Sequence, residues 1–302
     1  MIYTVTCNPS IDLFVQAELV VGELNRVESE EYMPGGKGIN VSIIAHELGA
    51  ETVATGFLGG FTGEFVKNEL DKAGVANHFI PCNGITRINM KVAGIDETEI
   101  NLRGLTVERK EYQALVKYLE SVLTSEDAVI LSGSTASGVT QDDYLEICEL
   151  ANQKGALLVV DTSRAYLEAC LSQKPFLIKP NVQELAEILK RSISGEDEIV
   201  DCAKKLQEKG AQNVLVSNGR HGAILVTEEG VYYGESLEGV RVNSIGAGDS
   251  MVAGFVVEWM RTKDYKTALK MGLTCGSCTA FTDRLAKGEE ILKRLPEAVV
   301  TQ

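Results

Sequence analysis

The sequence predicts an α/β protein with a mostly parallel central sheet, and two patterns carry that prediction. Short runs that are apolar along their whole length alternate with segments in which apolar residues recur every three or four positions. Such runs are typical of strands buried on both faces, and their alternation with helices is typical of a parallel sheet covered by helices. The 302 residues allow one large domain or two smaller ones, each with a substantial core.

The predicted elements follow one another along the chain. The strands are expected at Ile2–Cys7, Val53–Leu58, Ala128–Ser132, Ala156–Asp161, Phe176–Lys179, Asn213–Ser217 and Ala223–Thr227. The helices are expected at Ile39–Leu48, Gly63–Lys72, Val107–Leu123, Asp142–Gln153, Val182–Lys190, Glu198–Glu208 and Ala247–Met260.

Two segments, residues 12–33 and 86–104, break this alternation. Polar and apolar residues alternate in them and no helix intervenes, as in Arg87-Ile88-Asn89-Met90-Lys91-Val92. This pattern is typical of strands with one face in solvent. We therefore expect a single α/β domain over residues 1–302, in which these two segments form a small β-sheet over the substrate face.

Composition argues against several kinds of partner. The 29 basic and 43 acidic residues give a net charge of −14, which disfavours general binding to nucleic acid or to anionic lipid. No apolar run approaches the ~20 residues that span a bilayer. The N-terminus reads directly as a strand, and the seven cysteines are an odd number without regular spacing. We expect reduced thiols and a cytoplasmic location.

The segment Gly246-Ala247-Gly248-Asp249-Ser250 opens a strongly apolar helical run. Glycines let the backbone turn tightly, and the first N–H groups of a helix, aided by its dipole, bind an anion. A carboxylate at such a site repels the anion, so it is unexpected there unless it takes part in the chemistry. In phosphoryl transfer, the amides stabilise the moving phosphoryl group while Asp249 accepts the proton of the attacking hydroxyl. A glycine turn with an acidic helix start explains these five residues equally well.

Three further turns are candidate ligand sites, each with an ordinary structural alternative. Residues 35–40, Gly-Gly-Lys-Gly-Ile-Asn, lack Walker A spacing and suit a small polyhydroxylated ligand or a flexible turn. Asn181 and Glu184, in the first turn of a predicted helix, could offer oxygens to Mg²⁺ directly or through water, or could form a capping box. Residues 217–222 could accommodate a nucleotide or be only a turn.

Four basic residues lie nearest to these turns and to the two β-segments. They are Arg26, Lys37, Arg87 and Lys91. Arginine binds a phosphate through two parallel hydrogen bonds, and lysine binds it as a point charge. Each of the four, taken alone, is equally a candidate for an ordinary solvated side chain.

Together these residues resemble the ribokinase-like sugar kinases, also called the carbohydrate kinase PfkB family, over essentially the whole chain. Two family signatures occur in the right order, at Gly35–Val41 and Asn243–Ser250, with supporting motifs at Asn8–Asp12, Gly56–Gly60 and Lys179–Asn181. Within the family, the chain is most similar to the 1-phosphofructokinase and tagatose-6-phosphate kinase branch, through Gly-Gly-Lys-Gly, Thr86–Asn89 and Glu97–Asn101.

The resemblance implies a ribokinase-like three-layer sandwich with a β-sheet lid, and it implies a role for each motif. Asp249 would be the catalytic base, and the anion hole would consist of Gly246, Ala247 and Gly248. Sugar hydroxyls would bind to Asp12, Gly36 and Asn40. The phosphate already on the sugar would bind to Lys37, Arg87 and Ser134, and also to Arg26 and Lys91. ATP would lie against Lys179, Asn181, Ser217, Gly219 and Gly222. Glu184, with Asn181, would hold Mg²⁺ through water.

Two loops depart from the family pattern. Residues 135–137 replace a usual Pro-Pro turn, so we expect a looser loop at Ser134. Residues 102–105 replace an expected Gly-Pro segment, so the sequence does not predict the structure of the lid hinge.

These inferences lead to a prediction of function. We expect an ATP- and Mg²⁺-dependent kinase that converts fructose 1-phosphate to fructose 1,6-bisphosphate, with tagatose 6-phosphate as the alternative substrate. Its partners would be the sugar phosphate, ATP and a second copy of the chain bound through the lid, with no nucleic acid and no membrane. An alternative of another class is a sugar-phosphate sensor without turnover. A nicotinamide-dependent oxidoreductase is disfavoured because neither glycine cluster has the dinucleotide fingerprint.

Overall fold

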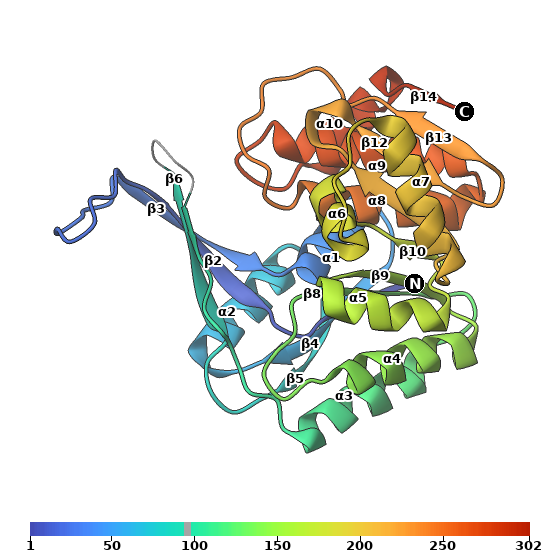
Figure 1. The fold of residues 1–302 in the computed structure, drawn as a ribbon. Coiled ribbons are helices and arrows are strands. Elements are labelled where there is room, and N and C mark those ends of the chain that lie inside the picture. Colours follow the sequence, from blue (N-terminus) through green and yellow to red (C-terminus); the bar gives the residue numbers. More distant parts are fainter. Residues whose placement is uncertain (94–97) are drawn as a thin grey trace.

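The fold is known from a computed structural model that describes residues 1–93 and 98–302. Within these residues the chain forms a ten-stranded sheet covered by helices and a separate four-stranded sheet (Figure 1). The predicted α/β architecture with a mostly parallel central sheet is therefore confirmed. Glu97, the first residue of one motif used in the prediction, lies outside the described residues.

The large sheet has the strand order β14-β13-β12-β11-β10-β9-β8-β1-β4-β5. Strands β4, β5, β8, β9, β10 and β11 run parallel to their neighbours or to β1, whereas β12, β13 and β14 pair antiparallel at one edge. The strands are β1 (Ile2–Thr6), β4 (Thr52–Leu58), β5 (Ala76–Pro81), β8 (Ala128–Gly133), β9 (Leu157–Thr162), β10 (Leu177–Ile178), β11 (Asn213–Ser217), β12 (Ala223–Val226), β13 (Val231–Gly234) and β14 (Val300–Thr301).

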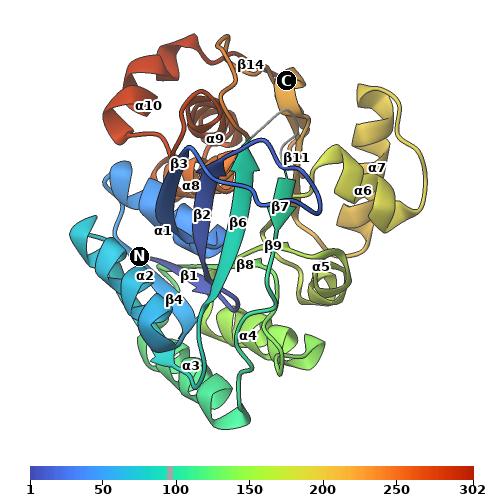
Figure 2. The same cartoon turned by 90° about the vertical axis from the view of Figure 1, so that its left-hand side faces the viewer.

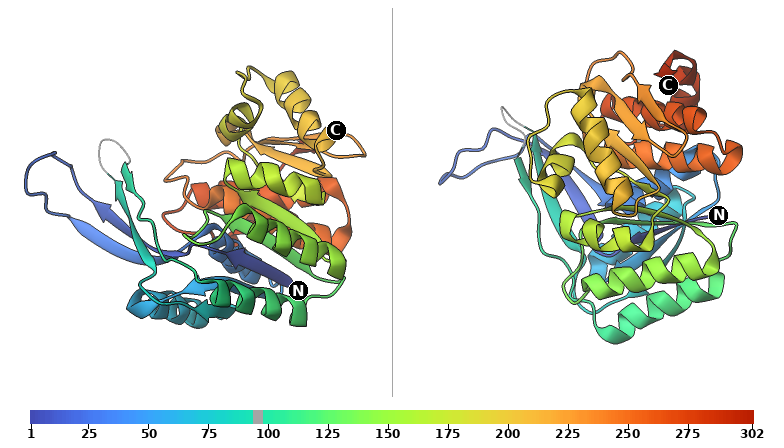
Figure 3. Two further views of the ribbon diagram at one scale, coloured as in Figure 1. Left: turned by 60° about the horizontal axis from the view of Figure 1, so that its bottom comes forward. Right: turned by 45° about the vertical axis from the view of Figure 1, so that its right-hand side comes forward.

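Helices cover both faces of this sheet and make three layers (Figure 3). The helices are α1 (Lys37–Glu47), α2 (Gly60–Lys72), α3 (Arg109–Val122), α4 (Gln141–Lys154), α5 (Arg164–Cys170), α6 (Val182–Leu189), α7 (Glu196–Glu208), α8 (Ala247–Thr262), α9 (Tyr265–Ala280) and α10 (Gly288–Arg294). The largest core cluster joins one face of the sheet to α3, α4, α5, α6 and α7, and the second joins the other face to α1, α8, α9 and α10. Burial of apolar side chains on both faces is the main stabilising contribution of this arrangement.

The small sheet has the order β3-β2-β6-β7 and is formed by β2 (Ser10–Gln16), β3 (Ser29–Gly35), β6 (Arg87–Ala93) and β7 (Thr98–Ile100). Strand β2 follows β1 after three residues, so the small sheet begins at the carboxyl end of the large one. Figure 2 shows it lying across the front of the large sheet. The polar and apolar alternation of these segments matches their two faces, as the sequence predicts.

Most predicted elements begin and end within three residues of their observed bounds. Helix α2 begins at Gly60 rather than Gly63, because Gly59 is extended and the glycines after it join the helix. The short helices α5 and α10 and the strands β5, β13 and β14 lack a long apolar pattern, and the sequence does not predict them; it also does not predict α9, a helix of 16 residues. No helix among the described residues is both long and apolar enough to cross a membrane.

Candidate active site

The predicted site residues meet at the carboxyl ends of the parallel strands, below the small sheet. Asn8 follows β1, Ser134 follows β8, and Lys179 follows β10. Parallel strands end at one edge of a sheet, and ligands of open α/β sheets bind at that edge. Distant parts of the chain therefore supply neighbouring side chains.

Asp249 lies in the first turn of α8, where its carboxylate is buried. Gly246, the residue before the helix, has φ of 74°, a left-handed conformation that favours glycine. Asp249 is 7% exposed, and its Oδ2 accepts a hydrogen bond of 2.8 Å from the side-chain amide of Asn40. Burial raises the pKa of Asp249 to about 6, while the Lys37 ammonium and the Asn40 hydrogen bond act in the opposite direction. Such a carboxylate is largely ionised at pH 7 and can accept a proton from a hydroxyl.

Asp161 holds two lysines beside Asp249. The Lys37 Nζ lies 3.0 Å from Asp161 Oδ1, and the Lys179 Nζ lies 3.8 Å from Asp161 Oδ2. Burial alone would raise the pKa of Asp161, but the two ammonium groups lower it. Burial alone would lower the pKa of Lys37, but the carboxylates of Asp161 and Asp249 raise it. A methyl group placed on Gly248 would lie 3.2 Å from the Lys179 Nζ, so this ammonium adjoins the predicted anion hole.

Asp12 of the small sheet is fixed in position by two side chains that the sequence analysis missed. Its Oδ1 accepts hydrogen bonds from Ser10 Oγ at 2.7 Å and Asn89 Nδ2 at 3.0 Å. Asn89 pairs with Asp12 across β2 and β6, so both side chains point to one face of the sheet. The sequence predicts that the two segments share a small sheet, but it does not give the register that sets Asn89 beside Asp12. A methyl group on Gly35 would lie 2.5 Å from Asp12 Cγ, so the neighbouring strand fits only with glycine there.

Arg87 and Ser134 meet as the sequence predicts for a phosphate site. An Arg87 amino group donates to Ser134 Oγ at 3.2 Å and to the Asn8 carbonyl at 2.9 Å, and the other donates to the Leu102 carbonyl at 3.1 Å. The Arg87 Nε is buried and has no partner among the described residues. Burial lowers the pKa of Arg87, and Asp12 opposes that shift.

Both loops that depart from the family pattern are tied to this arginine site. The Asn8 amide donates to the carbonyls of Arg103 and Thr135, each at 3.0 Å, while Arg87 binds Leu102. The expected looseness at Ser134 is therefore not seen: the loop is anchored through Asn8 and Arg87.

Two predicted basic residues lie apart from this cluster. Lys91 pairs with Glu99 at 2.6 Å and lines a cavity of about 540 Å³ between the small sheet and residues 242–245. Arg26 lies in the exposed loop that joins β2 to β3, at the far tip of the small sheet (Figure 1). The structure does not bring Arg26 to Arg87 and Ser134 within one chain.

Asn181 and Glu184 form the capping box that was the alternative to a metal site. Asn181 Oδ1 accepts from the Glu184 amide at 2.7 Å, and Glu184 Oε2 accepts from the Asn181 amide at 2.8 Å. The second Glu184 oxygen remains for a ligand. No cluster of three or more metal-binding side chains occurs among the described residues. The donors therefore fit an ion held mainly by water and phosphate oxygens, as Mg²⁺ usually is beside nucleotides.

The segment from Ser217 to Gly222 lies next to Asn181. Ser217 forms an isolated bridge with Asn181, and the Ser217 amide donates to the Pro180 carbonyl at 3.1 Å. Gly219 and Gly222 have φ of 54° and 88°, conformations that glycine adopts without strain. The backbone is open at Gly219, where a methyl group would meet no atom within 4 Å, whereas Gly222 packs against the backbone of Gly234.

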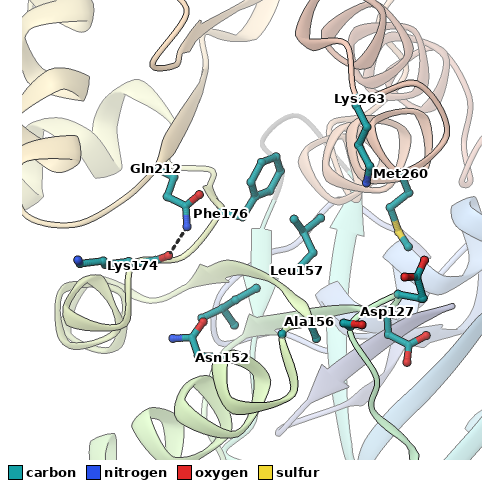
Figure 4. Close-up of a pocket in the computed structure, with 13 residues that line it drawn as sticks. Asp127, Asn152, Ala156, Leu157, Lys174, Phe176, Gln212, Met260 and Lys263 are labelled. Carbon is teal, nitrogen blue, oxygen red and sulfur yellow. Dashed lines mark hydrogen bonds between the residues drawn. The ribbon is translucent and has the colours of Figure 1, made fainter.

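A second cavity, of about 290 Å³, lies at the opposite edge of the large sheet (Figure 4). It is lined by residues around the amino ends of β8, β9, β10 and β11, among them Asp127, Asn152, Phe176 and Lys263. It is remote from Asp249, which lies at the carboxyl ends of the strands.

A buried carboxylate at an anion-binding helix start, beside two ammonium groups and under a small sheet, is the arrangement of a ribokinase-like phosphotransferase. The model of the pfkB family carbohydrate kinases matches residues 6–288, and the chain belongs to this family. The resemblance stated from the sequence is confirmed.

Individual relatives support this assignment over the full chain. The chain is 42% identical over 303 residues to 1-phosphofructokinase of Bacillus subtilis, covering 100% of both proteins. It is 37% identical to D-tagatose-1-phosphate kinase of Bacillus licheniformis, covering 94% of each. The crystal structure of a putative phosphofructokinase from Staphylococcus aureus has a TM-score of 0.87 and 36% identity, covering 100% of this chain and 98% of that one.

Proposed function

We propose that the protein transfers the γ-phosphoryl group of ATP to fructose 1-phosphate and so makes fructose 1,6-bisphosphate. The observation that carries this proposal is the buried, ionisable Asp249 at the start of α8, with the Arg87–Ser134 pair some distance away at the base of the small sheet. The two sites suit the two ends of one sugar phosphate. The 1-phosphofructokinase relative supports the same substrate.

Asp249 acts as the general base of this reaction. The hydroxyl oxygen of the sugar bonds to the γ-phosphorus while the bond from that phosphorus to the oxygen of ADP breaks, and the hydroxyl proton goes to Asp249. With a pKa of about 6, Asp249 is largely ionised at pH 7 and remains basic enough to take the proton late in a loose transition state. The Gly246–Gly248 amides stabilise the charge on the moving group.

The sugar lies between α1 and the small sheet. Asp12, Gly36 and Asn40 bind its hydroxyls, and Arg87 with Ser134 binds its phosphate. Asn40 also donates to Asp249, which links sugar binding to the base. Lys91 lies further along the same face of the small sheet, paired with Glu99. Arg26, at the sheet's tip, would serve as a phosphate ligand in the cleft of a second copy.

ATP lies on the other side of Asp249, along Lys179, Asn181, Ser217, Gly219 and Gly222. Glu184, assisted by Asn181, would hold Mg²⁺ through water, and the ion would neutralise charge on the phosphates being separated. Residues 1–302 act as one unit, in which the small sheet serves as a lid that excludes water, because hydrolysis of ATP competes with transfer.

The outer face of the small sheet supports a homodimer formed through that sheet. Tyr32, Leu13, Met90 and Ile100 align across the four strands on the face opposite Asp12. Tyr32 and Ile100 are 48% and 50% exposed, which leaves an apolar row open to a second copy. Sedimentation of the wild type and of Leu13→Asp tests this: a dimer for the first and a monomer for the second are expected. We place the enzyme in the cytoplasm, in line with its free cysteines.

A tagatose phosphate is the alternative substrate. The D-tagatose-1-phosphate kinase relative favours tagatose 1-phosphate over tagatose 6-phosphate. Tagatose 1-phosphate would present the same end of the sugar to Asp249 as fructose 1-phosphate does. Fructose and tagatose differ at one hydroxyl, and a hydrogen-bonding group on the protein can discriminate such a difference strongly. A sensor without turnover remains the alternative of another class.

ADP release with Mg·ATP tests these proposals in one experiment. Fructose 1-phosphate, tagatose 1-phosphate, tagatose 6-phosphate and unphosphorylated fructose are compared by kcat/KM. A preference for fructose 1-phosphate is expected. A preference for a tagatose phosphate would move the assignment, and tight binding of every sugar phosphate without ADP release would favour the sensor.

A further inference from the structure

Asp161 is a buried carboxylate that binds two lysines, Lys37 of the Gly35–Val41 motif and Lys179 of the proposed ATP wall. It is the penultimate residue of the buried strand β9 and is 4% exposed. Its two oxygens lie on two different ammonium groups, Lys37 on one side and Lys179 on the other. A buried carboxylate needs such compensation, but a single partner would satisfy that need.

The surrounding charges show what this arrangement prevents. Lys37 stabilises the ionised form of Asp249 more than any other charge nearby, so its ammonium lies within electrostatic reach of the base. Yet the hydrogen bond that the structure gives Asp249 comes from the neutral amide of Asn40, and the Lys37 ammonium is bonded to Asp161. A direct ion pair between Lys37 and Asp249 would lower the pKa of the base and weaken it as a proton acceptor.

The position of the lysines suggests what they do instead. Lys179 adjoins Gly248 of the anion hole, and Lys37 is the first residue of α1, immediately after the Gly36 turn. The Lys179 ammonium therefore lies beside the start of α8, where negative charge develops during transfer, and the Lys37 ammonium is bonded to the same carboxylate and lies within electrostatic reach of Asp249. Neither is bonded to Arg87 or Ser134, which form the phosphate site at the base of the small sheet.

We propose that Asp161 is a positioning residue for phosphoryl transfer, which holds the Lys37 ammonium on the path of the transferring group and away from Asp249. This inference rests on the proposed function. During transfer, Lys37 donates N–H hydrogen bonds to oxygens of the moving phosphoryl group and gives up no proton. The hydroxyl proton goes to Asp249, the new bond joins the sugar oxygen to phosphorus, and ADP leaves. Lys37 thus acts on the transition state rather than on the phosphate already present on the sugar.

The test is a double-mutant cycle with Asp161→Asn, Lys37→Met and the double variant, measured by steady-state kinetics. Lys37→Met should lower kcat about 100-fold, the usual effect of removing one group that stabilises the transition state, and should change the KM of fructose 1-phosphate less than threefold. Asp161→Asn should lower kcat about 10- to 100-fold, because it displaces Lys37 without removing it. The double variant should be no slower than Lys37→Met.

Two controls distinguish positioning from a purely structural role. Glu47→Gln removes a more exposed ion pair of similar length, between Glu47 and Lys287 at 2.8 Å, away from the strand ends, and should leave kcat unchanged. Asp161→Glu keeps the charge and should recover part of the lost kcat. If Asp161→Asn does not fold, Lys37→Met still tests the proposal, because Lys179 remains to compensate Asp161.

Four results would overturn the inference. The first is a tenfold rise in the KM of fructose 1-phosphate with unchanged kcat in Lys37→Met, which would place Lys37 on the sugar's own phosphate. The second is additive loss in the double variant. The third is a tenfold higher Mg²⁺ requirement for Asp161→Asn, which would make Asp161 a metal ligand. An inactive wild type would remove the proposed function and this inference with it, whereas the first three, in an active wild type, would remove only the inference.

Discussion

Replacing Asp249 with asparagine removes a negative charge that the fold buries at a cost. Burial raises the pKa of Asp249 from its ordinary value of 3.8 to about 6. The folded chain therefore holds this proton more tightly than the unfolded chain, and folding becomes less favourable as the pH rises through that window. The two values differ by about 2 units, which corresponds to about 3 kcal/mol of lost stability above pH 6.

Asp249→Asn should thus be more stable than the wild type at pH 8 and much less active. The gain in unfolding free energy should approach about 3 kcal/mol at pH 8, shrink to a small fraction of that at pH 4, and vanish only well below the unfolded-state pKa of 3.8, where the wild-type carboxyl is protonated in both states. Asparagine keeps the shape of the side chain and can still accept the Asn40 hydrogen bond, so substrate binding should persist. Loss of the base should lower kcat about 10²- to 10⁴-fold.

Urea unfolding at pH 4, 6 and 8 measures the stability difference, and ADP release measures turnover. Asp127→Asn is a matched control of opposite sign. Although burial acts the other way, hydrogen bonds from Thr124 lower the pKa of Asp127, so that substitution should destabilise the protein at pH 8. Equal stability of Asp249→Asn and wild type at pH 8 would refute the electrostatic reasoning, and near-normal turnover would refute the role as base.

Three further predictions concern the same cleft. Gly35→Ala places a methyl group 2.5 Å from Asp12 Cγ, so the KM of the sugar phosphate should rise about tenfold while the KM of ATP stays constant in steady-state assays. Arg284→Gln breaks an exposed ion pair with Glu31 of the small sheet, and the KM of the sugar phosphate should rise about 1.5- to 5-fold. High salt should abolish this difference from the wild type, and the exchanged pair E31R/R284E should restore the wild-type KM. Because Asp249 must be ionised to act, the pH profile of kcat/KM, which reports the free enzyme, should fall tenfold per unit below about pH 6 and be level above it; a fall that begins only below pH 4 would contradict the raised pKa.

The sequence was most informative where local patterns carry structural meaning. The apolar strands and the start of α8 at Gly246-Ala247 could be predicted, because a buried strand and a glycine turn each leave a pattern within a few residues. Asn181 and Glu184 illustrate the limit of such patterns. One spacing fits both a capping box and a metal site, and the structure forms the capping box while leaving one carboxylate oxygen for a ligand.

Long-range partners were not predictable. Asp161 was predicted at the end of a strand and Asn89 within an alternating segment and a family motif, but neither was predicted as a site residue, because their significance depends on Lys37 and Asp12, which other strands and helices bring to them. Arg26 shows the reverse case. Its residue type suits a phosphate, but its place at the tip of the small sheet separates it from the Arg87 site of its own chain.

The sequence by itself determined the α/β class, the order of most elements and the positions of the glycine turns, since backbone conformation and apolar periodicity are local properties. The tertiary structure alone decided that Asp249, Asn40 and Asp161, which come from three separate elements, share one buried space. It also decided that Asp249 has a raised pKa and that Lys37 pairs with Asp161. Electrostatic energies depend on distance and on burial, and neither can be read from positions along a chain.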